Sequence, residues 1–300
     1  GLTAAAKQRQ AELGKVCELV PFGRAPFLVT APHNAFLLRD GQPPHQLEQF
    51  TTGIAQQLAR DLDGEALCWT RQMQWRTAFR FSLALRWKRN AQAECFERAL
   101  DKGIRDPNYI HQDELRGSPW YRRMESWASK QAHGASNMSL HIDVHGCQDP
   151  PMWPTHAILG LGAMRQNLEG LAEDDPTRDL LLNRLHNFAL VVEPAVAHAL
   201  APVLGVPPHE AASLRGLKEA VTETGERAET LSGAWPPGTG RLTQTQQSVS
   251  NAGISHAVQI ELSLSLRRAL VREPWAVGKL AHALRTSWQK AIAMESTNRA

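Results

Sequence analysis

The sequence contains few cysteines and no closely spaced pair of them. Its four cysteines are Cys17, Cys68, Cys95 and Cys147, which stand far apart and form no CxxC pair. A zinc ribbon needs such pairs and a disulfide framework needs a much higher density of cysteine, so the spacing excludes both. Dispersed cysteines are typical of a reducing compartment, and we expect a cytoplasmic location.

Long apolar runs and long basic runs are missing as well. No apolar stretch approaches the ~18 residues that a bilayer-spanning helix needs. The N-terminal residues also lack the apolar segment of a signal peptide, so we expect no membrane partner. The formal net charge is only +3, and no block of lysine and arginine is long enough to follow a phosphate backbone. We therefore expect no nucleic acid partner.

The sequence shows no internal repeat and no low-complexity linker. Hydrophobic residues make up 42% and charged residues 21% of the chain, which is typical of a globular protein with a sizeable core and excludes disorder. Because no composition shift marks a boundary, we expect residues 1–300 to form a single catalytic domain. The sequence does not set the oligomeric state.

Short apolar segments alternate with helical patterns along the chain. The predicted strands are Pro26–Thr30, Glu65–Thr70, Ser139–His145, His156–Leu161 and His256–Leu262. The predicted helices are Leu47–Leu62, a stretch opened by Asp175-Pro176 and running toward Asn187, Ala195–Leu204 and Trp275–Ala293. Residues 232–253 have loop chemistry, and the pattern of residues 71–89 favours no element. This order predicts an α/β fold with a mixed central sheet flanked by helices.

Three of the predicted strands end in side chains that bind metals or transfer protons. His33 follows the first strand in Ala-Pro-His-Asn, His145 closes the strand SLHIDVH, and Glu261 lies in HAVQIEL. Ligands of open α/β sheets gather at the carboxyl ends of the strands. Two imidazoles and a carboxylate, with one position open to water, make a catalytic zinc site. The sequence therefore predicts a metal site that contains His33 and His145.

Four short blocks in order resemble the N-formylglutamate amidohydrolase family. They are Ala-Pro-His33-Asn34, Arg105-Asp106-Pro107-Asn108, Asp143-Val-His145-Gly146 and Gln259-Ile-Glu261-Leu262, beside the family's PH[SG], NRxP, DxH[SG] and Q[LI]E. The resemblance covers roughly Pro26 to Leu270. It implies a phosphorylase/hydrolase-like α/β fold similar to the zinc carboxypeptidases, with one Zn²⁺ per chain. It also implies a deformylase or deacylase activity on an N-acyl amino acid or short peptide, typically an acidic one.

The resemblance also implies roles for individual residues. His33 and His145 would bind zinc, and the middle ligand would be a carboxylate, for which we choose Glu48 with Asp40 as the alternative. Glu261 would be the general base that takes a proton from a zinc-bound water and passes it to the leaving amine.

Further residues of the four blocks would contact the substrate or support the ligands. Arg105 would pair with a substrate carboxylate or polarise the scissile carbonyl, and Asn108 and Gln259 would contact the same substrate. Asp143 would orient a histidine through its ring N–H, and His141 would act similarly or replace a ligand. We interpret Cys147 as a packing residue near the site.

The chain departs from the family pattern at two places. Ile104 stands where the family often has asparagine before Arg105, and PHNA replaces PHSG. These departures leave two other functions open. One is a zinc carboxypeptidase-like peptidase or amidase that acts on a biosynthetic intermediate. The other is a non-catalytic relative that binds a metabolite or a protein. A His/His/carboxylate site also accepts several divalent ions besides zinc.

Overall fold

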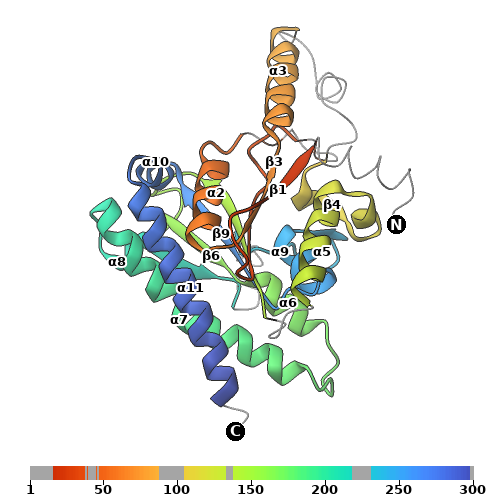
Figure 1. Ribbon diagram of the computed structural model, residues 1–300, viewed down its shortest axis with the longest axis vertical. Coiled ribbons are helices and arrows are strands. Elements are labelled where there is room, and N and C mark those ends of the chain that lie inside the picture. The colour runs from red at the N-terminus through yellow and green to blue at the C-terminus, as the bar shows by residue number, and fades with distance from the viewer. Residues whose placement is uncertain are drawn as a thin grey trace, which may run out of the picture.

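A seven-stranded mixed sheet forms the centre of the fold (Figure 1). The computed structural model describes residues 16–37, 39, 45, 47–87, 105–132, 138–217 and 231–297. The strands are β1 (Cys17–Pro21), β2 (Phe27–Ala31), β3 (Glu65–Trp69), β5 (Leu140–Cys147), β6 (Ala157–Gly160), β7 (Ala212–Arg215) and β9 (His256–Ser263), in the order β1-β3-β2-β5-β9-β6-β7. β3, β2, β5 and β9 run parallel, whereas β1 and β6 pair antiparallel with β3 and β9. This confirms the predicted mixed α/β architecture.

Helices cover both faces of the sheet. They are α2 (Thr51–Asp61), α3 (Arg71–Trp87), α5 (Pro119–Ala132), α6 (Gly162–Glu169), α7 (Arg178–Leu204), α8 (Pro208–Ala211), α9 (Gln244–Gln246), α10 (Leu264–Arg272) and α11 (Pro274–Thr297). Shorter elements are η1 (Pro107–Tyr109), η2 (Gln112–Gly117), the π-helical η3 (Gln247–Asn251) and a two-stranded sheet of β4 (Ile110–His111) and β8 (Arg241–Leu242). In Figure 1, α2, α7, α10 and α11 lie on one side of the sheet, and α5 and α9 lie on the other.

The alternation of side chains along β5 decides which face of the sheet carries the chemistry. Leu140, Ile142 and Val144 belong to the main core cluster, together with buried residues of α2, α7 and α11. The intervening polar residues of β5 point to the opposite face because successive strand residues alternate. The parallel register pairs Asp143 with Gln259 and His145 with Glu261. Gln259 and Glu261 of β9 therefore share one face of the sheet with Asp143 and His145 of β5.

The first helix begins later than the sequence pattern predicts. We predicted a helix from Leu47, but α2 begins at Thr51 and Phe50 caps it in a left-handed conformation, with φ of 73°. The apolar spacing was misleading because Leu47 and Phe50 lie in the preceding loop and are partly exposed. The Glu48 N–H donates to the His33 carbonyl at 2.9 Å, which holds this loop against the end of β2.

The helix predicted to open at Pro176 also starts later, at Arg178. The Asp175 carboxylate accepts hydrogen bonds from the backbone N–H and the hydroxyl of Thr177, and this turn delays the helix. The two predicted helical stretches form one continuous α7. Within the described part of the chain, α7 is long and apolar enough by composition to cross a membrane. It packs on the sheet and on α11, which is the environment of a core helix.

Residues 232–253 are more ordered than their loop-like composition predicts. They contain β8, α9 and η3, and a capping box at Thr243 begins α9. Gln244, Thr245 and Gln247 are fully buried. Gln244 Oε1 accepts a hydrogen bond from Trp120 Nε1, Thr245 Oγ1 donates to the Gly233 carbonyl, and Gln247 Nε2 donates to the Pro107 carbonyl. A composition that usually marks a solvated loop therefore forms a packed element here. Residues 71–87, where the sequence pattern favours no element, form α3.

Candidate metal centre

His33, Glu48 and His145 converge although they come from three separate segments. His33 follows β2, Glu48 lies in the loop before α2, and His145 lies on β5. All three are buried, and their ligand atoms lie within 4.8 Å of one another. His33 Nδ1 lies 2.9 Å from Glu48 Oε1 and 3.0 Å from His145 Nδ1. The structure thus brings together the three residues predicted as metal ligands, while Asp40, the alternative to Glu48, lies outside the described residues.

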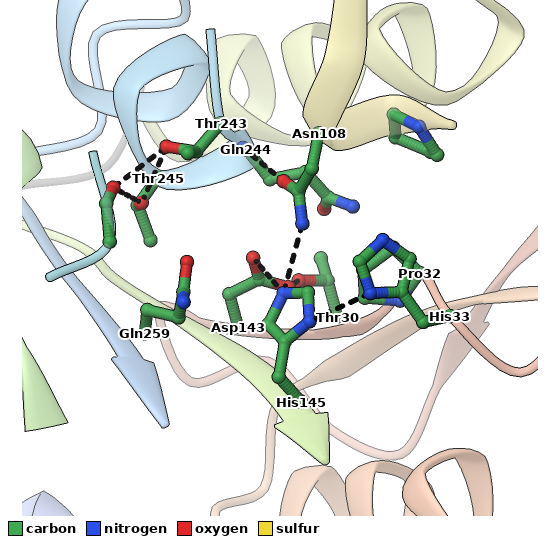
Figure 2. A network of polar contacts seen from close by, with 12 residues as sticks. Thr30, Pro32, His33, Asn108, Asp143, His145, Thr243, Gln244, Thr245 and Gln259 are labelled. Atoms are coloured by element: carbon green, nitrogen blue, oxygen red, sulfur yellow. Dashed lines mark hydrogen bonds and ion pairs between the residues drawn. The ribbon is translucent and has the colours of Figure 1, made fainter. Parts of the chain in front are cut away.

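The outer nitrogen of each histidine meets a carboxylate. His33 Nε2 lies 2.9 Å from Asp106 Oδ1, and His145 Nε2 lies 2.9 Å from Asp143 Oδ2 (the latter in Figure 2). A carboxylate keeps the proton on the nitrogen that it faces, so each ring donates from Nε2. The two Nδ1 atoms face each other and the Glu48 carboxylate, and without a proton on either ring atom both would present lone pairs to the same point. Lone pairs at this distance repel unless a proton or a cation lies between them. The donor set therefore fits a divalent metal ion.

Carboxylates dominate the charge around the two rings. Burial alone would lower the pKa of His33, but Asp106 and Glu48 outweigh it and raise the pKa to about 9. Burial would also lower the pKa of His145. Asp143 and Glu48 outweigh this effect and raise the pKa well above its ordinary value. In return the imidazoles hold the pKa of Glu48 well below its usual range, against the effect of burial. The cluster therefore favours positive charge at its centre.

A buried chain of hydrogen bonds continues from His145 into the sheet. Thr30 Oγ1 donates to Asp143 Oδ1 at 2.5 Å and lies 2.8 Å from His141 Nε2. Burial lowers the pKa of His141 to about 4, so this ring is neutral at neutral pH and donates from Nε2 to Thr30. The chain thus runs from His141 through Thr30 and Asp143 to His145. His141 lies behind the ligand rather than among the three converging groups.

Glu261 lies beside His145 on the neighbouring strand, because the register of β5 and β9 pairs the two residues. Its carboxylate accepts a hydrogen bond from Gln259 Nε2 at 2.8 Å. Burial raises the pKa of Glu261 to about 7, with His145 opposing the rise and Glu48 adding to it. A carboxyl group that titrates near neutrality can both accept a proton and return it. Gln259 contacts this carboxylate, while we had predicted that it contacts substrate.

Arg105, which we had predicted to contact substrate, forms an ion pair with a surface carboxylate. Its side chain is 42% exposed and pairs with both carboxylate oxygens of Glu114 at 2.7 Å. The neighbouring Asp106 is the residue that turns inward, because its carboxylate accepts the Asn108 N–H and caps η1. Arg39 reaches this carboxylate instead, with Nε 2.7 Å from Asp106 Oδ2.

Asn108 connects the cluster to the segment that contains α9. Its Oδ1 accepts the Gln244 N–H at 2.7 Å, which sets the orientation of the amide (Figure 2). Its Nδ2 then lies 3.0 Å from His145 Nε2. His145 Nε2 therefore has two polar neighbours, the Asp143 carboxylate and the Asn108 amide. Asn108 thus contacts a predicted metal ligand, while we had predicted that it contacts substrate.

The sequence analysis missed three residues of the cluster: Asp106, Arg39 and His45. His45 stacks on His33 with ring centroids 3.7 Å apart, and its Nε2 lies 3.3 Å from Glu48 Oε1. Asp106 stood inside one of the four family blocks without an assigned role. Its place inside that block was the signal that could have identified it. Carboxylates commonly orient metal-binding histidines, so an acidic residue in the block was a candidate for this role.

Cys147 lies two residues after His145 and has a free thiol. Burial raises its pKa to about 12, with Glu261 adding to the rise and Arg267 opposing it. The thiol is therefore protonated at neutral pH. A reactive cysteine needs a thiolate, so this residue is not an activated nucleophile.

Comparison with known proteins gives only distant similarities. No protein-family model and no curated protein matches the sequence. The chain is similar in structure to gene product Atu2144 from Agrobacterium tumefaciens, with 10% identity, a TM-score of 0.47, and coverage of 95% of this chain and 97% of that one. It is also similar to a bacteriophage poly-gamma-glutamate hydrolase, with 12% identity, a TM-score of 0.40, and coverage of 97% and 96%. The site is therefore interpreted from its own geometry.

Proposed function

We propose that the protein is a zinc-dependent amidohydrolase that cleaves the N-formyl or N-acyl amide of a small amino acid or peptide. One observation carries the proposal: His33 Nδ1 and His145 Nδ1 face each other at 3.0 Å beside the Glu48 carboxylate. Two imidazoles and one carboxylate form a ligand set of catalytic zinc sites. The resemblance to the N-formylglutamate amidohydrolase family suggests the type of bond.

His33, Glu48 and His145 would hold the metal. When bound, Zn²⁺ supplies a Lewis acid and lowers the pKa of a water molecule. Glu261 accepts a proton from the attacking water as the water oxygen forms a bond to the acyl carbon. The C–N bond then breaks, and Glu261 returns the proton to the leaving amine nitrogen. The products are a carboxylic acid and a free amine. The pKa of about 7 at Glu261 suits both transfers.

Basic side chains near the cluster support an anionic substrate. The Arg39 guanidinium lies 4.3 Å from the centroid of the Tyr109 ring, and the Arg241 guanidinium lies 5.4 Å from the same centroid. Arg39 uses its Nε for Asp106, and its side chain remains 18% exposed. We therefore assign to Arg39 the recognition of a substrate carboxylate that the family resemblance implied for Arg105. We place the activity in the cytoplasm, in keeping with the dispersed cysteines.

Elemental analysis of the purified protein beside His145→Ala tests the proposal. We expect about one zinc per chain in the parent, loss of zinc in His145→Ala, and retention in His209→Ala, whose side chain is 80% exposed. Release of glutamate from N-formyl-L-glutamate is then the first activity to measure. A parent protein that stays metal-free after incubation with Zn²⁺ would contradict the proposal and favour a non-catalytic binding protein.

A further inference from the structure

One buried arginine contacts the backbone at three places around the cluster. Arg267 belongs to α10, directly after β9, and its side chain is almost fully buried. Its Nε donates to the Leu262 carbonyl at 3.0 Å, its Nη1 to the Gln49 carbonyl at 2.6 Å, and its Nη2 to the Cys147 carbonyl at 3.2 Å. All three nitrogens of the guanidinium therefore bind main-chain oxygen atoms.

Each of these carbonyls lies within two residues of a functional side chain. Gln49 follows Glu48, Leu262 follows Glu261, and Cys147 is two residues after His145. The three segments are the loop before α2, strand β9 and strand β5, and they are far apart in sequence. A guanidinium presents its N–H donors in a rigid plane, so one group can hold three separate carbonyls at fixed spacing.

Gly146 provides the space that this arrangement needs. A methyl group added at Gly146 would lie 2.6 Å from Cζ of Arg267. Any larger residue would therefore push the guanidinium away from β5. The Gly146 N–H also donates to Glu48 Oε2 at 2.8 Å. The same glycine thus contacts both the arginine and a predicted metal ligand.

Burying the charged guanidinium of Arg267 costs free energy, because the charge is removed from water. The neighbouring residues Leu266, Ala269 and Leu270 of α10 are buried and apolar. An apolar side chain at position 267 would continue this packing without the cost of removing a charge from water. The location of the arginine between the three segments of the site therefore points to a role in the site as well as in folding.

We propose that Arg267 is a positioning residue that fixes the relative placement of Glu48, His145 and Glu261 before metal binds. The proposal rests on the metal site of the proposed function. Arg267 touches no metal-binding atom in the structure and acts through the backbone of the three segments. Loss of a group that orients metal ligands typically weakens metal affinity by about 10- to 100-fold, and we expect an effect of this size.

The test compares Arg267→Lys, Arg267→Met and Gly146→Ala with the parent. Arg268→Met is the matched control, because Arg268 is the exposed neighbour on the same helix. The dissociation constant for Zn²⁺ is measured by competition with a chromophoric chelator, and the visible spectrum of the Co²⁺-substituted protein reports ligand geometry. Urea unfolding of the metal-free proteins measures stability separately.

We expect Arg267→Lys and Gly146→Ala to unfold cooperatively, to bind Zn²⁺ about 10- to 100-fold more weakly and to change the Co²⁺ spectrum. Arg267→Lys should bind more tightly than Arg267→Met, and the control should match the parent. Parent-like affinity and spectrum in the variants overturn this proposal alone. Loss of cooperative unfolding in both Arg267→Lys and Gly146→Ala assigns a purely structural role and also overturns it. A parent that binds no Zn²⁺ overturns the proposed function and this inference together.

Discussion

His33 Nδ1 lies 3.0 Å from His145 Nδ1, while the Nε2 atom of each ring faces its own buried aspartate. With both outer nitrogens engaged by carboxylates, the inner nitrogens offer two lone pairs to the same point. Glu48 approaches that point from a third segment. The arrangement is balanced electrostatically when a cation occupies the centre.

Asp106→Asn should weaken Zn²⁺ binding by about 10- to 100-fold, because the amide no longer holds the Nε2 proton of His33 by a charge-assisted bond. Isothermal titration with Zn²⁺ measures the effect. Asp175→Asn is the matched control, since the Asp175 carboxylate is partly exposed and accepts its hydrogen bonds from Thr177 in its own turn. Equal affinities in Asp106→Asn and the parent would show that His33 does not need this carboxylate to bind metal.

Glu261→Gln should retain zinc and lose hydrolysis. Glutamine keeps the size and the hydrogen bonding of the side chain but cannot take up a proton, and loss of general base catalysis typically costs about 10²- to 10⁴-fold in rate. The measurement pairs the zinc content of the variant with its kcat for N-formyl-L-glutamate. Loss of zinc with the activity would instead place Glu261 among the metal ligands.

Arg105→Ala and Arg39→Ala should differ in their effect on substrate. Arg105 is exposed and pairs with Glu114, an interaction that contributes about 0–1 kcal/mol to stability. Because, among the described residues, this pair contacts neither Glu261 nor a predicted metal ligand, Arg105→Ala should leave kcat/KM unchanged. Arg39→Ala removes a charged donor, and hydrogen bonds to charged groups contribute about 1.5–3 kcal/mol, equivalent to roughly 10- to 100-fold in kcat/KM. Steady-state kinetics with N-formyl-L-glutamate decide between them. A larger effect at Arg105 would restore the role implied by the family resemblance.

His256 should make the protein sensitive to mild acid. Burial lowers its pKa to about 3, and Arg184 adds to the effect, while the nearby Glu295 is itself paired with Arg184. The unfolded chain binds a proton near pH 6.5 that the folded protein rejects. The free energy of unfolding is therefore not reduced by His256 above pH 6.5. Between pH 6.5 and pH 3 it falls by up to about 1.4 kcal/mol per pH unit, because protonation of His256 favours the unfolded chain.

Urea unfolding of the parent and of His256→Gln between pH 3 and pH 7 measures this contribution. The variant should lose the part of the pH dependence that belongs to His256, although it is less stable at neutral pH. His209→Gln, at an exposed site, serves as the control. Parallel curves for parent and variant would show that His256 does not titrate differently in the folded and unfolded states.

Much of the sheet is predictable from the sequence because strand periodicity is a local property. The segments that end at Thr30, His145 and Leu262 alternate or concentrate apolar residues in the way that a buried sheet requires, and each forms a strand within two residues of its predicted bounds. The edge strands β1 and β7 escaped prediction, since edge strands are short and half exposed.

The starts of helices were predicted less well, since they depend on contacts outside the helix. The apolar spacing from Leu47 continues the pattern of α2 backward, but the hydrogen bond from Glu48 N–H to the His33 carbonyl draws that segment toward β2. The helix therefore begins on the C-terminal side of this contact, at Thr51. A long-range hydrogen bond thus overrides a local periodicity.

By itself the sequence determined that His33, His145 and Glu261 lie at or near strand ends, because each follows or interrupts an apolar strand pattern. The sequence left the middle carboxylate open between Glu48 and Asp40 and indicated no role for Asp106, and the tertiary structure brings Glu48 and Asp106 to His33. Glu48 and Asp106 reach His33 across 15 and 73 residues of chain, and Arg105 turns outward because its neighbour Asp106 turns inward. Strand patterns depend on adjacent residues, whereas the convergence of distant loops depends on how the whole chain packs.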